Sequence, residues 1–293
     1  MITTMKIGIG LPNPIPGVEG RIMIDWARRA EERGFSSLAT IDRVAFPSYE
    51  SLVSLAAAAA VTERIGLVTN VLLATTRSPV LLAKEAASVD QLSSGRFTLG
   101  VGVGARRDDF EASQREFAER GKRFDDELVL MHAAWKANPV IGGCDEPVTP
   151  VPVNGSTVPI IFGGTSDQMI ERLVRYGIGW TAGGGPPDMV GPFAERVRKA
   201  WKDGGRAGDP KIMALQYFSM GDDVVDASKK YILHYYGFLG ERAQGFADFG
   251  VHRSEKAIKD VIAKFEDAGV DEVILDPTVA DLRQIDLLAN AVL

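Results

Sequence analysis

The stretch that decides the fold reads Phe97-Thr98-Leu99-Gly100-Val101-Gly102-Val103-Gly104, and two arginines, Arg106 and Arg107, follow it closely. Large apolar residues alternate with threonine and glycine, which is the pattern of a strand whose second face has no bulky side chain. Glycine inside a strand weakens it and marks a place where another backbone or a ligand comes close. We therefore expect a ligand at this strand end; a tight barrel corner with solvated arginines is the alternative.

Short apolar runs alternate with helical patterns along the whole chain. The candidate strands are residues 7–11, 37–41, 65–74, 97–103, 159–162, 179–182, 212–220 and 272–275. Strands separated by helices of this length favour parallel pairing, and eight of them favour a closed (β/α)8 barrel, a TIM barrel of the α/β class. We expect a single domain over residues 1–293, with an insertion at about 139–158 after the fourth helix. A doubly wound open sheet is the alternative.

Composition excludes several classes of protein. The formal net charge is −6 and no basic patch is visible, which argues against a nucleic-acid partner. Cys144 is the single cysteine and the 3 histidines lack metal-ligand spacing, so we expect neither an internal disulfide nor a metal. We also expect no leader segment and no membrane partner, because no apolar run reaches the roughly 18 residues that span a bilayer. These features are typical of a cytoplasmic protein.

Polar residues gather where the predicted strands end, and in a barrel of this kind the chemistry lies at those ends. The second strand is followed by Asp42 and Arg43, an acid and a base at the rim; a salt bridge that pins a loop is the alternative interpretation. The third strand carries Thr69 and Asn70 inside an apolar run, and inward polar side chains in a barrel need a partner. All of these side chains are candidate ligand contacts.

Two further strand ends are almost bare of side chains. Gly163-Gly164-Thr165-Ser166 leads directly into a helical pattern. Exposed N–H groups and the positive end of a helix dipole suit a phosphate; ordinary capping by Thr165 or Ser166 is the alternative. The loop that begins at Gly183 is similarly bare. No Ser-His-Asp, Cys-His or paired-carboxylate pattern appears in the sequence, so the rim suits a cofactor that carries its own chemistry.

Three segments together resemble the bacterial luciferase-like superfamily of flavin- and deazaflavin-dependent oxidoreductases, the luciferase-like monooxygenase family. They are residues 62–67, 91–104 and 120–126. The resemblance implies FMN or coenzyme F420 at the C-terminal face of the barrel, with its ring on a bulge that contains a non-proline cis peptide at Asn70-Val71. The cofactor-binding residues that we then expect are Thr69, Asn70, Val71, Gly102, Val103, Gly104, Ala105, Gly163, Gly164, Thr165, Ser166 and Gly183.

The sequence departs from the family's pattern at one position. Many members carry histidine after the acid that follows the second strand, whereas this chain has Arg43, which stays charged and cannot act as a general base. We expect Asp42 to orient Arg43, and Arg43 to bind an anionic substrate or to stabilise charge on the reduced cofactor. Asp42 and Arg43 are therefore the catalytic candidates, and Arg106 and Arg107 are expected to gate the mouth or to meet the substrate.

The leading hypothesis is an oxidoreductase that transfers a hydride or activates oxygen on a small organic substrate. The alternatives are a barrel that binds a flavin or deazaflavin without turnover, and an unrelated barrel enzyme acting on a phosphorylated sugar. The resemblance also implies a homodimer. The alanine-rich segment 55–61 offers a helix that approaches a partner closely, or one that packs on its own barrel.

Overall fold

The computed structural model describes residues 5–142 and 145–293. Eight parallel strands form a closed barrel, because the last strand pairs with both the first and the seventh. In order around the barrel they are β1 (Lys6–Gly10), β2 (Ser37–Thr40), β3 (Gly66–Thr69), β5 (Phe97–Gly102), β6 (Ile160–Gly163), β7 (Gly179–Ala182), β8 (Lys211–Phe218) and β10 (Glu272–Pro277). The expected TIM barrel is confirmed, and the open sheet is excluded.

Two short strands extend this sheet. β4 (Leu72–Leu73) continues the chain after β3 and pairs with β5, and β9 (Val251–His252) pairs with the end of β8. The long third strand expected at 65–74 is thus interrupted at Asn70 and Val71. That interruption is the bulge described below.

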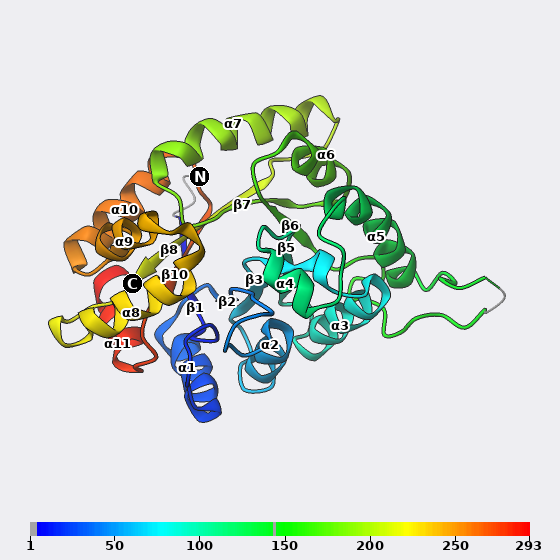
Figure 1. The fold of residues 1–293 in the computed structure, drawn as a ribbon. Helices are drawn as coiled ribbons and strands as arrows, with labels where there is room; N and C mark the ends of the chain where they lie inside the picture. Colours follow the sequence, from blue (N-terminus) through cyan, green and yellow to red (C-terminus); the bar gives the residue numbers. More distant parts are fainter. Residues whose placement is uncertain (1–4, 143–144) are drawn as a thin grey trace.

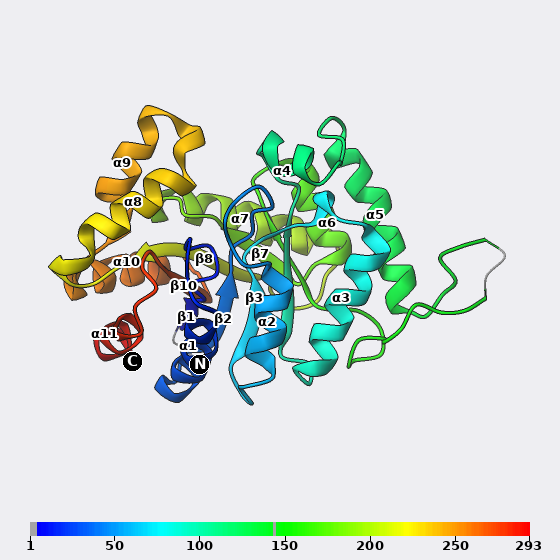
Figure 2. The same ribbon diagram turned by 60° about the horizontal axis from the view of Figure 1, so that its bottom comes forward.

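Helices surround the barrel (Figure 1). Those that follow the strands are α1 (Gly20–Arg33), α2 (Ser51–Ala59), α3 (Pro79–Leu92), α5 (Arg120–Trp135), α6 (Asp167–Tyr176), α7 (Pro187–Asp203), α10 (Glu255–Asp267) and α11 (Arg283–Val292). Three more, α4 (Arg107–Ala112), α8 (Val225–Tyr235) and α9 (Glu241–Phe249), are added to this repeat. Figure 2 shows them toward the end of the barrel to which β2 runs. None of the helices in the described ranges is long and apolar enough to cross a membrane.

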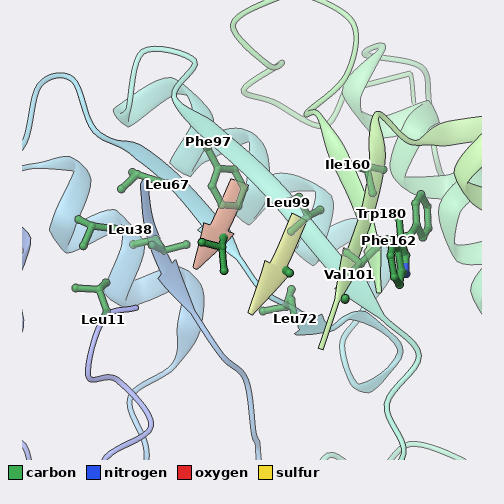
Figure 3. Packing of buried hydrophobic residues seen from close by; sticks show 14 of the residues in the cluster. Leu11, Leu38, Leu67, Leu72, Phe97, Leu99, Val101, Ile160, Phe162 and Trp180 are labelled. Atoms are coloured by element: carbon green, nitrogen blue, oxygen red, sulfur yellow. The ribbon is translucent and has the colours of Figure 1, made fainter. Parts of the chain in front are cut away.

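Side chains alternate between two cores along the strands. Leu38, Leu67, Phe97, Leu99 and Ile160 belong to the larger core between barrel and helices (Figure 3). The barrel interior is filled by a smaller set, Ala39, Val68, Ile161, Met213 and Ile274. The alternation expected for Phe97, Leu99 and Val101 is confirmed, since all three are fully buried on the helix side.

Glycine lets neighbouring strands approach on the inner side of the barrel. A Cβ at Gly100 would lie 1.8 Å from the carbonyl oxygen of Thr69, a distance that no side chain permits.

The segment between α5 and β6, which contains the expected insertion, projects away from the barrel in Figures 1 and 2. Gly143 and Cys144 of that insertion lie outside the described residues.

Candidate functional site

The bulge after β3 brings one polar side chain into the barrel mouth. The peptide bond between Asn70 and Val71 is cis, as expected. Asn70 Oδ1 accepts a hydrogen bond from Thr181 Oγ1 at 2.7 Å, whereas Asn70 Nδ2 is buried and has no partner among residues 5–142 and 145–293. The Thr69 hydroxyl has already used its hydrogen, because it donates to the carbonyl oxygen of Gly100 at 2.7 Å. Asn70 is therefore the member of this pair with a donor left for a ligand.

A wall without side chains stands beside Val71. A Cβ at Gly102 or at Gly163 would lie 3.0 Å from a methyl group of Val71, so the valine lies against both bare positions. Gly104 has a positive φ of 72°, and its carbonyl oxygen accepts from Arg120 Nε at 2.9 Å. The expected tail contacts Val103 and Ala105 lie on the same segment, half-buried and exposed respectively. The structure thus gathers Val71, the β5 glycines and Gly163 at one place.

The expected phosphate site lies at the start of α6. Ser166 is the N-cap, and its Oγ accepts from the Met169 N–H at 3.2 Å, so the capping interpretation is confirmed for this residue. Gly164, with a positive φ of 112°, and Thr165 are exposed in front of the helix. The bare loop at Gly183 is exposed too, on the neighbouring strand end. Together these backbones offer an open, electropositive helix start.

Asp42 is buried, but its partner is not Arg43. It accepts hydrogen bonds from Arg77 Nη1 at 2.8 Å and Nη2 at 3.1 Å, and from the Leu73 N–H at 2.9 Å. Burial alone would lower the pKa of Arg77, but the charges of Asp42 and Glu50 outweigh burial and raise that pKa above its ordinary value. Asp42 therefore fixes the backbone that leaves the bulge.

Arg43 is buried in a separate ion pair. Its Nε lies 2.8 Å from Asp109 Oδ2 and its Nη2 lies 2.6 Å from Asp108 Oδ2. The backbone N–H groups of Val44 and Ala45 also donate to Asp109, each at 2.8 Å. The expectation that Asp42 orients Arg43 is wrong, because Asp42 pairs with Arg77 before α3, whereas Arg43 pairs with two acids on α4. Two carboxylates already neutralise Arg43, which weighs against its expected role as an anion binder.

Arg106 crosses the mouth from the loop after β5 to α8. The carbon at the centre of its guanidinium lies 4.8 Å from the ring centre of Tyr235 and 4.2 Å from that of Phe238. The hydroxyls of Tyr217 and Tyr236 lie 2.8 Å apart, and burial raises the pKa of Tyr236 to about 12. Tyr217, Tyr231, Tyr235 and Tyr236 form what we call the tyrosine cluster. The guanidinium of Arg106 lies over two rings of this cluster, those of Tyr235 and Tyr236. The guanidinium carbon of Arg107 lies 4.6 Å from the ring centre of Phe117 instead.

Asp276 was missed by sequence reasoning. It is fully buried on β10, and neither carboxyl oxygen has a hydrogen-bond partner in the described part of the chain. Its Oδ1 lies 1.8 Å from the point that a Cβ of Gly10 would occupy, so the glycine makes room for the acid. Burial raises the pKa of Asp276 well above its usual range. The available signal was an acid directly after the apolar run 273–275, like Asp42 after the expected strand 37–41. Arg77 and Asp109 were missed for lack of such a signal.

Luciferase-like monooxygenases are described by a family model that matches residues 5–281. The chain belongs to this family. An uncharacterized protein of Mycobacterium tuberculosis is 26% identical over 304 residues, covering 92% of this chain and 94% of that protein. The expected family is confirmed.

Solved structures share the fold over nearly the whole chain. A monooxygenase from Streptomyces bottropensis superposes with a TM-score of 0.76 at 22% identity, covering 98% of both chains. An F420-dependent secondary alcohol dehydrogenase, solved with an F420-acetone adduct, gives 0.76 at 18% identity, covering 99% of this chain and 98% of that one. An FMN complex of a 3,6-diketocamphane monooxygenase from Pseudomonas putida gives 0.73 at 17%, with 99% and 98% covered.

Proposed function

We propose that the protein is an oxidoreductase that binds FMN or coenzyme F420 in the barrel mouth and acts on a small organic substrate. One observation carries the proposal: the Asn70-Val71 bulge lies against the bare glycines Gly102 and Gly163, and Gly163 leads into the start of α6. Family membership supports it, and so do the similar folds of an F420-dependent and an FMN-containing enzyme.

The residues of the mouth fit a planar ring with a phosphorylated tail. Asn70 Nδ2, held by the bond from Thr181 to Oδ1, is a fixed donor for a ring oxygen or nitrogen. Val71 would back the ring, and a tail would pass the half-buried backbone of Gly102 and Gly104, whose missing side chains leave room for Val71 and Phe110. When bound, such a cofactor supplies hydride transfer or, if it is reduced FMN, oxygen activation. The chain itself binds and orients it, and Asp42 holds the bulge in place through the Leu73 N–H.

The test is a titration of the purified protein with FMN and, separately, with F420, followed by fluorescence. We expect saturable binding of one of them. Gly104→Val should weaken it by about tenfold or more, because the positive φ and the nearby Phe110 oppose a branched side chain. Gly20→Ala is the matched control, since its nearest contact would be an ordinary 3.7 Å to the Tyr49 hydroxyl. Failure to bind either cofactor would contradict the proposal.

A barrel that binds the cofactor without turnover is the second candidate. It is favoured by Arg43, which stands where many family members have histidine and which is locked between Asp108 and Asp109. Oxidation of the reduced cofactor in the presence of a panel of ketones and aldehydes, which can accept the hydride, separates the two candidates. Substrate-dependent oxidation supports the oxidoreductase, and binding without any such oxidation supports the second candidate.

We further propose that this single-domain protein is a cytoplasmic homodimer. An apolar groove of about 580 Å³ runs between α2 and α3. Val53, Leu81 and Leu92 along it are 68%, 54% and 65% exposed, unusually high values for large apolar side chains. Of the alanine run, Ala58 and Ala59 are buried against the chain's own barrel, so only part of that segment is available to a partner.

A further inference from the structure

A cavity of about 460 Å³ opens beside α9. This volume lies in the range of sites that hold small organic ligands. Its walls come from the loop after β7 (Gly185), from α9 (Gly245, Phe246 and Phe249) and from β8 and β9 (Gln216 and His252). None of the expected cofactor contacts lines it in the part of the chain that the structure describes. The cavity is therefore separate from the site proposed above.

Hydrogen bonds along one wall fix which nitrogen of His252 carries the proton. Gln216 Nε2 donates to the carbonyl oxygen of Gly185 at 2.7 Å, so the amide oxygen of Gln216 is turned toward His252. That oxygen, Oε1, lies 3.2 Å from His252 Nε2. Because an amide oxygen can only accept, Nε2 carries the hydrogen and donates it. In a neutral imidazole the other nitrogen, Nδ1, is then a hydrogen-bond acceptor.

His252 Nδ1 is the polar atom of this wall that is left for a ligand. It has no hydrogen-bond partner within residues 5–142 and 145–293, yet it is not sealed from solvent. Burial of the ring, and then the positive charges of Arg253 and Lys264, lower the pKa of His252. The ring is therefore neutral at neutral pH, and a ligand in the cavity meets an acceptor that calls for an O–H or N–H donor.

The opposite element, α9, offers aromatic rings and a bare position. Phe249 lines the cavity and is 87% exposed, and Phe246 is held with its ring centre 5.7 Å from that of Tyr217. Gly245 lies inside the helix, where glycine is destabilising relative to alanine. A Cβ at Gly245 would meet no described atom within 4 Å, so packing within the chain does not require this glycine. Its missing side chain leaves room in the cavity that it lines.

We propose that this cavity binds a small aromatic alcohol, whose hydroxyl donates to His252 Nδ1 and whose ring lies against Phe246 and Phe249. Aromatic rings pack well against one another, and a bound hydroxyl satisfies the free acceptor. A carboxylate is disfavoured, because it has no hydrogen to donate to Nδ1. Arg242, the one lysine or arginine that lines the cavity in the described ranges, is exposed to water. The inference goes beyond the proposed function and requires no bound cofactor.

The test uses the purified protein and two probes with the same ring, phenol and anisole, with binding measured by ligand-observed NMR. Anisole has a methyl group in place of the hydroxyl hydrogen, so it cannot donate. We expect saturable binding of phenol and binding of anisole about tenfold weaker, the effect of one hydrogen bond. His252→Phe keeps a ring and removes the acceptor, so it should bind phenol only as weakly as anisole.

A second variant tests the place of the ligand without removing a polar group. Gly245→Leu fills the bare position and should weaken phenol binding by about tenfold or more. Leucine favours a helix more than glycine does, so this variant should unfold at the wild-type temperature or above it. Gln244→Leu is the matched control: Gln244 is the preceding residue of α9, does not line the cavity, and should bind phenol as the wild type does when replaced.

Four results would overturn the proposal. They are no saturable binding of phenol, equal binding of phenol and anisole by the wild type, unchanged phenol binding by His252→Phe, and unchanged phenol binding by Gly245→Leu. Benzoate tests the anion alternative, and we expect it to bind more weakly than phenol. Tighter binding of benzoate would also overturn the proposal and would assign the cavity to anions at Arg242. Because the cofactor titrations are separate, this proposal and the proposed function fail independently.

Discussion

Buried ionisable side chains near the strand ends fall into two opposite cases, paired and unpaired. Arg43 and Asp109 are both buried, and they compensate each other at 2.8 Å. Asp276 is just as buried and has no such partner in the described residues. Breaking a buried pair leaves a charge uncompensated, whereas removing a lone acid removes a cost. Substitutions at these residues should therefore change stability in opposite directions.

Arg43→Ala should lower the free energy of unfolding by about 3 kcal/mol, because it leaves the carboxylate of Asp109 buried without its cation. Urea unfolding followed by circular dichroism measures this change. Arg196→Ala is the control: its pair with Asp167 is exposed, so its loss should change the free energy by about 0.5 kcal/mol or less. Equal effects of the two variants would show that Arg43 is not held as described.

Asp276→Leu should raise the free energy of unfolding at neutral pH, and the gain should depend on pH. Burial raises the pKa of Asp276 in the folded protein, while the unfolded chain has the ordinary value of about 3.9. The unfolded state therefore loses this proton first, and the wild type loses stability as pH rises above about 4. The gain from leucine should grow from about pH 4 toward neutral pH in urea unfolding. A gain that is constant over this interval would contradict a neutral Asp276.

At the scale of the elements, local pattern predicts the strands because alternation is a property of consecutive residues. The alternation of Phe97, Leu99 and Val101 with glycine already predicts from the sequence that these three side chains are buried. The glycines between them predict the strand face that has no side chains. Pairing of side chains has no such local signal. Asp42 meets Arg77 35 residues away and Arg43 meets Asp109 66 residues away, so adjacency along the chain suggested the wrong pair.

The close approach of β3 and β5 tests the prediction that glycine is required on this face of β5. Gly100→Ala should lower the free energy of unfolding by about 3 kcal/mol or more, because its Cβ would lie 1.8 Å from the Thr69 carbonyl oxygen and the strands would have to separate. Gly183→Ala has no neighbour within 4 Å among the described atoms and should change it by about 0.5 kcal/mol or less. Thermal unfolding of both variants measures the difference. A mild effect at Gly100 would mean that β3 and β5 lie further apart.

At the scale of the whole molecule, the barrel mouth is built from segments distant in the sequence. Asn70 of the bulge after β3 is bonded to Thr181 on β7, and Arg106 of the loop after β5 lies over Tyr235 on α8. The outer face at α2 and α3 has no comparable cover in the described part of the chain, since Val53 and Leu81 remain exposed. The proposed cofactor site and the proposed dimer interface therefore lie on different parts of one barrel.

Leu81→Glu should convert the proposed dimer to a monomer. Leu81 is 54% exposed in the groove between α2 and α3, and a glutamate there would place a carboxylate among the apolar side chains that two copies would have to bury. Sedimentation velocity at micromolar concentration should give twice the 31.6 kDa chain mass for the wild type and the single mass for the variant. Met189→Glu, at a 70% exposed position on α7, is the control and should leave the dimer intact. A wild type that sediments as a monomer would contradict the proposed dimer. A Leu81→Glu variant that is still a dimer would show that the interface lies outside this groove.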